Sequence, residues 1–360
     1  MKTPIIEGIS LPGLVAYLKA RQYEALYWPT FFPLLNVNSL DGKTLIGGVG
    51  SRIAANVISY DSKAPEASRK VIQTQYFDIP KIAVSRRKTE KEILEHQITK
   101  TLRGQDAVIE DYFNDIDYCF DSVNARVEWL ALQALSLTKV QLTHQNNPMG
   151  IINETVIDFG MPDANKKTAT TAVWSTANAA SMTPIADIKA VVKAARAKGI
   201  TFQKILMHPD LYDIMTGSTE FQTAAKSLLI GESLILGLMS LDTTNKILTA
   251  LRLPEIALVE TSIGIEGKNG VFTETNPWDV NHVTFVPTLQ LGNLYNGPIA
   301  EEIERPADVI QAKRGNVLLS IKKEFNPVSV LTKGESNCFP SWPTVDRCFS
   351  LYTNSTSTWA

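Results

Sequence analysis

One stretch, Gln105–Lys139, constrains the fold of this chain more than any other feature. No proline or glycine interrupts it. At 1.5 Å per residue, a helix over residues 105–137 would be roughly 50 Å long, whereas a usual globular helix has about 11–12 residues. We therefore expect a spine across which other elements lie. Its apolar residues recur at steps of three or four and form one stripe: Val108, Tyr112, Ile116, Phe120, Val123, Val127, Leu130 and Ala134.

The opposite face of this predicted helix is acidic, and almost no base precedes Arg126. Such a face is either solvated or a contact surface for a basic partner, and both interpretations stay open. The carboxylates are Asp106, Glu110, Asp111, Asp115, Asp117 and Asp121.

Length and composition limit the class of protein. A chain of 360 residues can bury a sizeable core, and its length allows two or three domains. The net charge of −2 argues against a protein whose main task is to neutralise nucleic-acid phosphates. Three scattered cysteines predict buried thiols in a reducing compartment. The chain has no apolar run of membrane-spanning length and no signal peptide at its start, so we expect a soluble intracellular product without a membrane partner.

Residues 1–50 combine apolar residues without a clear period, and only a short helix over 14–25 is predicted. The rest of this arm is expected to be extended, and its aromatic residues need a surface on the chain's own core or on a neighbouring subunit. These aromatic residues are Tyr27, Trp28, Phe31 and Phe32.

The next segment is predicted to be a long hairpin over 53–87. Two strand-like runs, Ala55–Tyr60 and Val71–Phe77, flank a polar loop. A two-stranded hairpin is marginal in water, so this one must lie against another surface. Its candidate contact residues are Val57, Ile58, Tyr76 and Phe77, followed by the basic cluster Lys81, Arg86, Arg87 and Lys88. Thr89 and Glu92 then form a capping box that starts a helix over 90–102.

Helices and strands alternate over residues 181–310, which predicts one compact α/β domain. Thr183 is the expected N-cap of a helix over 184–198 that ends at Gly199. Further helices are expected from 209, over 219–229 and over 243–251, with strands over 202–207, 256–261 and 283–286. Strand character returns at 316–325, 328–331 and 348–352.

Catalytic motifs are absent from the sequence. The four histidines stand alone, which predicts no metal site and no histidine base. Asp41–Thr44 contains the GKT of a phosphate loop, but Val37 occupies the position of the required first glycine, so a plain Asp-Gly turn is predicted. We expect neither a catalytic site nor a cofactor.

Taken in order, these parts resemble the major capsid proteins of tailed phages, whose fold is named after phage Hong Kong 97, and most closely the phage lambda E type. Short motifs over about residues 45–352 carry the resemblance. They are Phe77–Ile82 for F-x-P-x-I, Arg126–Lys139 for R-x-E-x-x-x-x-A-L-x-x-G-K, Ile157–Pro162 with Trp174 and Asp187–Ile188 for D-x-G-x-P…W…D-I, Val286–Pro298 for V-P-x-G-x-x-G-x-x-Y-G-P, and Glu324–Pro327 with Phe339–Pro340 for E-x-D-P…L-P. Thr138 replaces the usual glycine of the second motif, and Asn326 replaces the aspartate of the last.

The resemblance implies an α+β fold of the Hong Kong 97 type. Its parts would be an N-terminal arm (1–50), an extended hairpin loop (51–88), a peripheral domain (89–180) with the spine helix (105–137), an axial domain (181–310) and a C-terminal return to the peripheral domain (311–360). The arm and the hairpin would reach over neighbouring subunits.

The implied function is that of a major capsid protein, which self-assembles through pentamers and hexamers into the icosahedral head shell around double-stranded DNA. The implied partners are other copies of the chain, a separate scaffolding protein, a portal protein, a candidate decoration protein, and packaged DNA contacted non-specifically. The location would be the virion, after assembly in the host cytoplasm. Two alternatives remain at this point, namely an encapsulin-like compartment shell and an α/β enzyme of unknown substrate.

Overall fold

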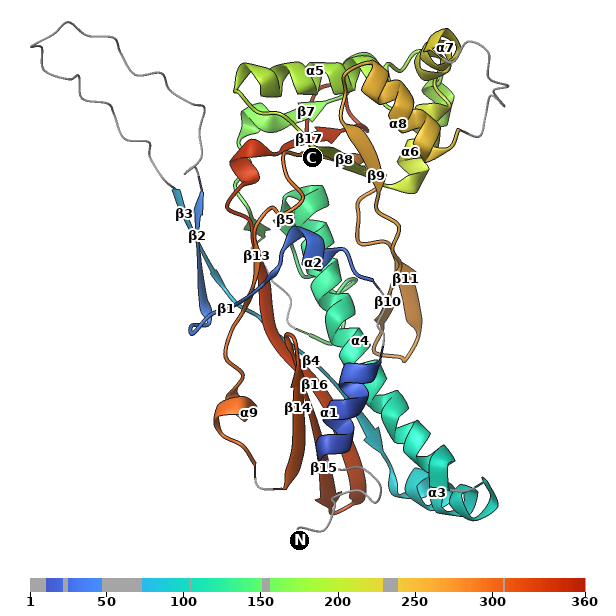
Figure 1. The fold of residues 1–360 in the computed structure, drawn as a ribbon, viewed down its shortest axis with the longest axis vertical. Coiled ribbons are helices and arrows are strands. Elements are labelled where there is room, and N and C mark those ends of the chain that lie inside the picture. The colour runs from blue at the N-terminus through green and yellow to red at the C-terminus, as the bar shows by residue number, and fades with distance from the viewer. Residues whose placement is uncertain are drawn as a thin grey trace, which may run out of the picture. The chain divides into compact units, whose positions relative to one another are not determined.

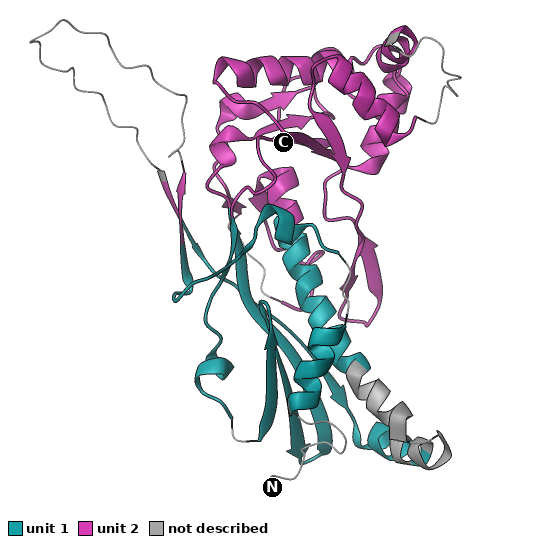
Figure 2. Cartoon of the chain, in the orientation of Figure 1, with its two compact units in different colours: residues 1–42, 76–131, 293–341 teal, residues 43–75, 132–292, 342–360 magenta. Residues whose placement is uncertain are grey.

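A computed structural model describes residues 11–21, 25–46, 73–103, 105–150, 156–228, 239–306 and 308–359. The chain forms two compact units (Figure 2). Unit 1 contains residues 1–42, 76–131 and 293–341, and unit 2 contains residues 43–75, 132–292 and 342–360. Each unit is therefore assembled from segments that are far apart in the sequence. None of the described helices is both long and apolar enough to cross a membrane.

The predicted spine is helix α4, Gln105–Leu137, with the expected bounds (Figure 1). The helix ends at Leu137, as predicted. The next residue, Thr138, adopts a left-handed conformation with φ of 57°, at the position where the capsid-protein motif has glycine. The preceding helix, α3, covers Glu90–Arg103. Its capping box is confirmed, because the Glu92 carboxylate accepts hydrogen bonds from the Thr89 backbone N–H at 2.7 Å and from the Thr89 hydroxyl at 2.8 Å.

Unit 1 is built on a six-stranded sheet with the order β1-β13-β16-β15-β14, in which β4 also pairs with β16. Two further helices, α1 and α2, precede the sheet in sequence, and the short α9 joins β13 to β14. The bounds are α1 Leu11–Ala20, α2 Trp28–Phe31, β1 Leu34–Asn36, β4 Lys81–Lys88, β13 Asn293–Asn296, α9 Ala300–Ile303, β14 Val309–Arg314, β15 Val317–Phe325 and β16 Val328–Ser341.

The core of unit 1 lies between this sheet, α4 and α1. Side chains of α4 meet alternate residues of β15 and two leucines of α1 in one buried cluster. The members from α4 are Ile116, Cys119, Phe120 and Val123, and those from the other elements include Leu14, Leu18, Val317, Leu319, Ile321 and Val330. The part of the predicted stripe formed by Ile116, Phe120 and Val123 therefore faces the sheet.

The hairpin prediction needs correction at both ends. Its described strands are β2, Asp41–Ile46, and β3, Gln73–Asp78, which form a two-stranded sheet. The predicted strand over 55–60, with Val57 and Ile58, lies outside the described residues. Lys81–Lys88, which we assigned to the loop 51–88, is strand β4 and pairs antiparallel with β16. The partner strand is more than 240 residues away in sequence, so no local pattern could show this pairing.

The predicted Asp41-Gly42 turn is also wrong, because both residues belong to strand β2. The glycine is needed here for space rather than for conformational freedom. A Cβ atom placed on Gly42 would lie 2.1 Å from Cε2 of the Phe77 ring. Phe77 in turn packs on Tyr295 and Phe339, with ring centroids 6.0 and 4.9 Å away.

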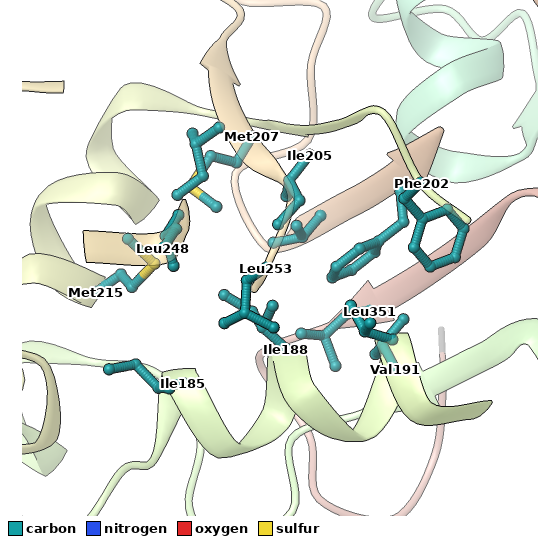
Figure 3. Packing of buried hydrophobic residues seen from close by; sticks show 14 of the residues in the cluster. Ile185, Ile188, Val191, Phe202, Ile205, Met207, Met215, Leu248, Leu253 and Leu351 are labelled. Carbon is teal, nitrogen blue, oxygen red and sulfur yellow. The ribbon is translucent and has the colours of Figure 1, made fainter. Parts of the chain in front are cut away.

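Unit 2 is an α/β unit with a five-stranded sheet in the order β7-β17-β12-β8-β9. Figure 3 shows how Ile188 and Val191 of α5 point toward Leu351 of β17 in its buried cluster. The helices are α5 Pro184–Ala197, α6 Pro209–Thr216, α7 Thr219–Leu228 and α8 Leu241–Ala250. The strands are β5 Lys139–Val140, β6 Ile157–Asp158, β7 Lys166–Thr168, β8 Lys204–Met207, β9 Glu255–Leu258, β10 Ile263–Glu266, β11 Phe272–Thr275, β12 His282–Val286 and β17 Phe349–Tyr352.

The predicted boundaries of the α/β domain, 181–310, therefore shift. Strand β17 comes from the C-terminal tail and lies between β7 and β12, whereas β13 joins unit 1. Strands β8 and β9 are parallel, and the helices between them form the crossover that parallel strands require. The predicted alternation of helices and strands is confirmed. The local sequence could not show that β17, from the C-terminal tail, completes the sheet.

The N-terminus of α5 is capped differently from the prediction. Thr183 occupies the N-cap position, but its side chain makes no cap hydrogen bond and its hydroxyl lies 3.0 Å from that of Thr171. The carboxylate of Glu220, on α7, accepts instead from the backbone N–H groups of Ile185 at 2.7 Å and Ala186 at 3.2 Å. A negative charge at this end also interacts favourably with the helix dipole.

Candidate functional site

The described residues contain no group of three or more His, Cys, Asp and Glu side chains placed to hold a metal ion. The three cysteines are buried and unbridged. Burial raises the pKa of the Cys119 and Cys338 thiols to about 11, so neither forms a reactive thiolate near neutral pH. The described residues thus show neither a metal-binding cluster nor a reactive thiol.

Trp28, Phe31 and Phe32 of the arm are buried in the chain's own core, which is one of the two surfaces that the sequence left open for the arm's aromatic residues. Trp28 is 8% exposed, Phe31 3% and Phe32 0%. Tyr27 is half-buried. The arm does not remain extended here, because α2 and β1 fold back onto unit 1, where β1 pairs parallel with β13.

A buried carboxylate anchors this part of the arm. Glu128 of α4 is 1% exposed and accepts hydrogen bonds from the backbone N–H groups of Tyr27 and Trp28, both at 2.8 Å. Burial raises the pKa of Glu128, and the two N–H donors oppose that shift. Glu128 is the glutamate of the R-x-E motif, so the motif supplies a side chain that fixes the arm against the spine helix.

The basic cluster predicted at the base of the hairpin is paired within unit 1. A guanidinium nitrogen of Arg86 lies 3.4 Å from a carboxylate oxygen of Asp115. The same guanidinium stacks over the Tyr118 ring, with its central carbon 3.5 Å from the ring centroid. Lys88 also lies 3.5 Å from Asp115. In the same unit, Lys81 pairs with Glu335 at 2.8 Å and Arg87 pairs with Glu324 at 2.9 Å.

The acidic face of α4 thus has basic partners in its own chain. Besides Asp115, Asp117 binds the Tyr17 hydroxyl at 2.5 Å and forms an ion pair with Arg21. Asp121 lies 3.4 Å from Arg21. Of the two interpretations left open by the sequence, the described part of this face is a contact surface, and the arm and β4 occupy it. The side chains of Asp106, Glu110 and Asp111 lie outside the described residues.

Exposed apolar side chains mark the surfaces that remain uncovered in the single chain. Tyr76 of β3 is 73% exposed, although its neighbour Phe77 is only 7% exposed. Sequence reasoning missed several others, among them Phe325 at 91%, Leu94 at 61% and Ile98 at 62%. Phe325 is the variable residue of the E-x-N-P turn, and Leu94 and Ile98 are four residues apart on α3. The place of Phe325 in the turn and the four-residue spacing of Leu94 and Ile98 are the sequence signals that could have indicated these exposed surfaces.

Comparison with known proteins identifies the family of the chain. The family model described as phage major capsid protein E matches residues 49–352. The chain belongs to this family. This capsid protein is a subunit of a phage shell, and the family indicates a structural role.

One solved structure with a TM-score above 0.5 shares the fold of this chain. A protein assigned as the capsid protein of an E. coli CFT073 prophage matches with a TM-score of 0.58 at 15% identity, over 96% of this chain and 99% of that chain. A phage-related protein from Bordetella bronchiseptica has a TM-score of 0.49 at 12% identity, covering 97% and 98% of the two chains. The capsid of cyanophage A-1(L) gives 0.47 at 11%, covering 93% and 95%. No curated protein sequence matches the chain.

Proposed function

We propose that this capsid protein assembles through rings of five and six copies into a closed icosahedral shell around packaged double-stranded DNA. In this proposal the fold is of the Hong Kong 97 type, unit 1 serves as the peripheral domain and unit 2 as the axial domain. DNA is contacted non-specifically, since the chain as a whole is slightly acidic. A scaffolding protein, a portal protein and a decoration protein are the proposed further partners, and assembly takes place in the host cytoplasm.

The observation that carries the proposal is the two-stranded sheet β2–β3. Within the described residues it has no third strand. It exposes Tyr76 at 73% and Leu45 at 53%. One face of the sheet is covered within the chain, since Thr44, Ile46 and Phe77 are buried. The exposed apolar side chains of the other face offer a contact to a further surface, which a sheet of only two strands needs for stability. A second copy of the chain is the proposed partner, because shells are built from repeated copies.

The test is assembly of the double variant Leu45→Ser/Tyr76→Ser. Shell formation is followed by sedimentation and negative-stain electron microscopy, and subunit stability by thermal melting. We expect loss of shells with a nearly unchanged Tm, because both side chains are exposed in the free subunit. Met149→Ser is the matched control, since Met149 is 64% exposed elsewhere on unit 2. Normal shells from the double variant, or a strictly monomeric wild-type protein at high concentration, would contradict the proposal.

A further inference from the structure

The turn between β15 and β16 presents an apolar tip to solvent. Phe325 and Val328 are direct partners in the antiparallel register, with Asn326 and Pro327 between them. Phe325 is 91% exposed and Val328 is 45% exposed. Because side chains alternate along a strand, Val328 lies on the same face as Val330, which is buried in the core of unit 1. The core-facing side of this hairpin therefore continues past the end of the core into solvent.

A second apolar patch lies on α3, at the same end of unit 1 (Figure 1). Ile93 turns toward the core cluster, whereas Leu94 and Ile98 are 61% and 62% exposed. The spacing of four residues places these two side chains on one helix face. Lys88 pairs with Val330 of β16, and helix α3 begins two residues after Lys88. Val330 is also two residues from Val328 of the tip, so both patches lie next to the same end of the sheet.

The charges around the two patches are complementary. Lys322 and Lys323, next to the tip, are exposed, and neither has an ion-pair partner among the described residues. Glu90, in the first turn of α3, is likewise exposed and without an ion pair in the described part of the chain. Glu324 is already bound to Arg87 and does not neutralise the tip. The tip is therefore apolar and basic, while the patch on α3 is apolar with an acidic start.

We propose that the β15–β16 tip of one copy docks on α3 of a second copy. Phe325 and Val328 pack against Leu94 and Ile98, and Lys323, which shares the strand face of Phe325, faces Glu90. The two patches differ, so the contact is heterologous and can repeat from copy to copy until a ring closes. The tip is not covered by its own chain, because Phe325 is almost fully exposed there. This inference rests on the proposed self-assembly and names a contact that carries it.

The first test removes each patch separately. Phe325→Ser and the double variant Leu94→Ser/Ile98→Ser should each lower the yield of shells by about tenfold or more, as expected for central apolar anchors. The Tm of the free subunit should stay at the wild-type value because the side chains are exposed. Ile303→Ser is the matched control, since Ile303 is 71% exposed on α9 of the same unit and lies in neither patch.

Mixing the two variants tests the heterologous geometry. Each mixed pair contains one intact tip, from the Leu94→Ser/Ile98→Ser copy, and one intact α3 patch, from the Phe325→Ser copy. We expect mixed dimers in sedimentation experiments, although neither variant dimerises alone and the mixture closes no shell.

A charge exchange tests the contact without removing apolar surface. Lys323→Glu should weaken assembly, and adding Glu90→Lys in the same chain should restore it to within about threefold of the wild type, whereas Lys322→Glu, on the opposite strand face, should leave assembly unchanged. If wild-type protein assembles and every variant assembles equally well, this inference is wrong while the proposed function stands. If the wild type itself never assembles, the proposed function fails first. Loss of assembly without charge rescue or mixed dimers would also overturn the contact as described.

Discussion

Replacing Glu128 with alanine should release the arm from α4. The carboxylate is buried and accepts two backbone N–H groups at 2.8 Å. Each buried donor left without a partner costs about 1–3 kcal/mol, partly offset because the charge no longer has to be desolvated. We expect Glu128→Ala to lower the free energy of unfolding by about 2–4 kcal/mol.

Two measurements check this expectation. Urea unfolding gives the stability change, and hydrogen exchange at the Tyr27 and Trp28 amides locates it. Both amides should exchange faster in Glu128→Ala under conditions where the core of α4 stays protected. Glu302→Ala is the control, because Glu302 pairs with Lys313 on the surface and such a pair contributes about 0–1 kcal/mol. Unchanged stability together with unchanged exchange at both amides would refute the anchoring role of Glu128.

The pH dependence gives an independent check with a defined sign. Burial raises the pKa of Glu128 in the folded protein above its ordinary value of 4.5. The folded state then binds this proton more tightly than the unfolded state, so the contribution of the group to stability is fully present below that value and declines as the pH rises through the raised pKa. Glu128→Gln cannot titrate. The difference in unfolding free energy, wild type minus Glu128→Gln, should therefore fall as the pH rises through this window.

Two substitutions and one chemical reaction test other parts of the structure. Gly334→Ala would place a Cβ atom 2.7 Å from the backbone oxygen of Cys119, and since backbone cannot move away cheaply, we expect a loss of about 1–3 kcal/mol in urea unfolding. Thr138→Gly should raise the unfolding free energy by up to about 1 kcal/mol, because the residue has φ of 57° and glycine adopts this conformation without strain; a loss of stability would show that the buried threonine contacts matter more. Burial raises the pKa of all three thiols, so a thiol reagent at pH 8 should react slowly with the native protein and rapidly in urea, and equal rates would contradict their burial.

Local interactions explain which elements could be predicted. The stripe of α4, its lack of helix breakers and the capping box of α3 all depend on residues within one or two turns of each other. The bounds of α4 and the cap at Thr89 therefore follow from the sequence alone. The E-x-N-P turn was also recognised, but its pattern says nothing about whether Phe325 is covered.

Distant partners explain what could not be predicted. Strand β4 is paired by a strand from the other end of the chain, and the N-terminus of α5 is capped by Glu220 from α7 rather than by the adjacent Thr183. The aromatic residues of the arm had two possible surfaces, and only the folded chain showed that Glu128 holds the backbone beside them.

The sequence by itself determined the spine helix, the alternating elements of the α/β unit and the order of motifs that resembles a capsid protein, because helix periodicity, capping and turn chemistry act between neighbouring residues. Only the tertiary structure decided which apolar side chains remain on the surface. Burial depends on what distant segments cover: the same aromatic character leaves Phe32 fully buried and Phe325 almost fully exposed.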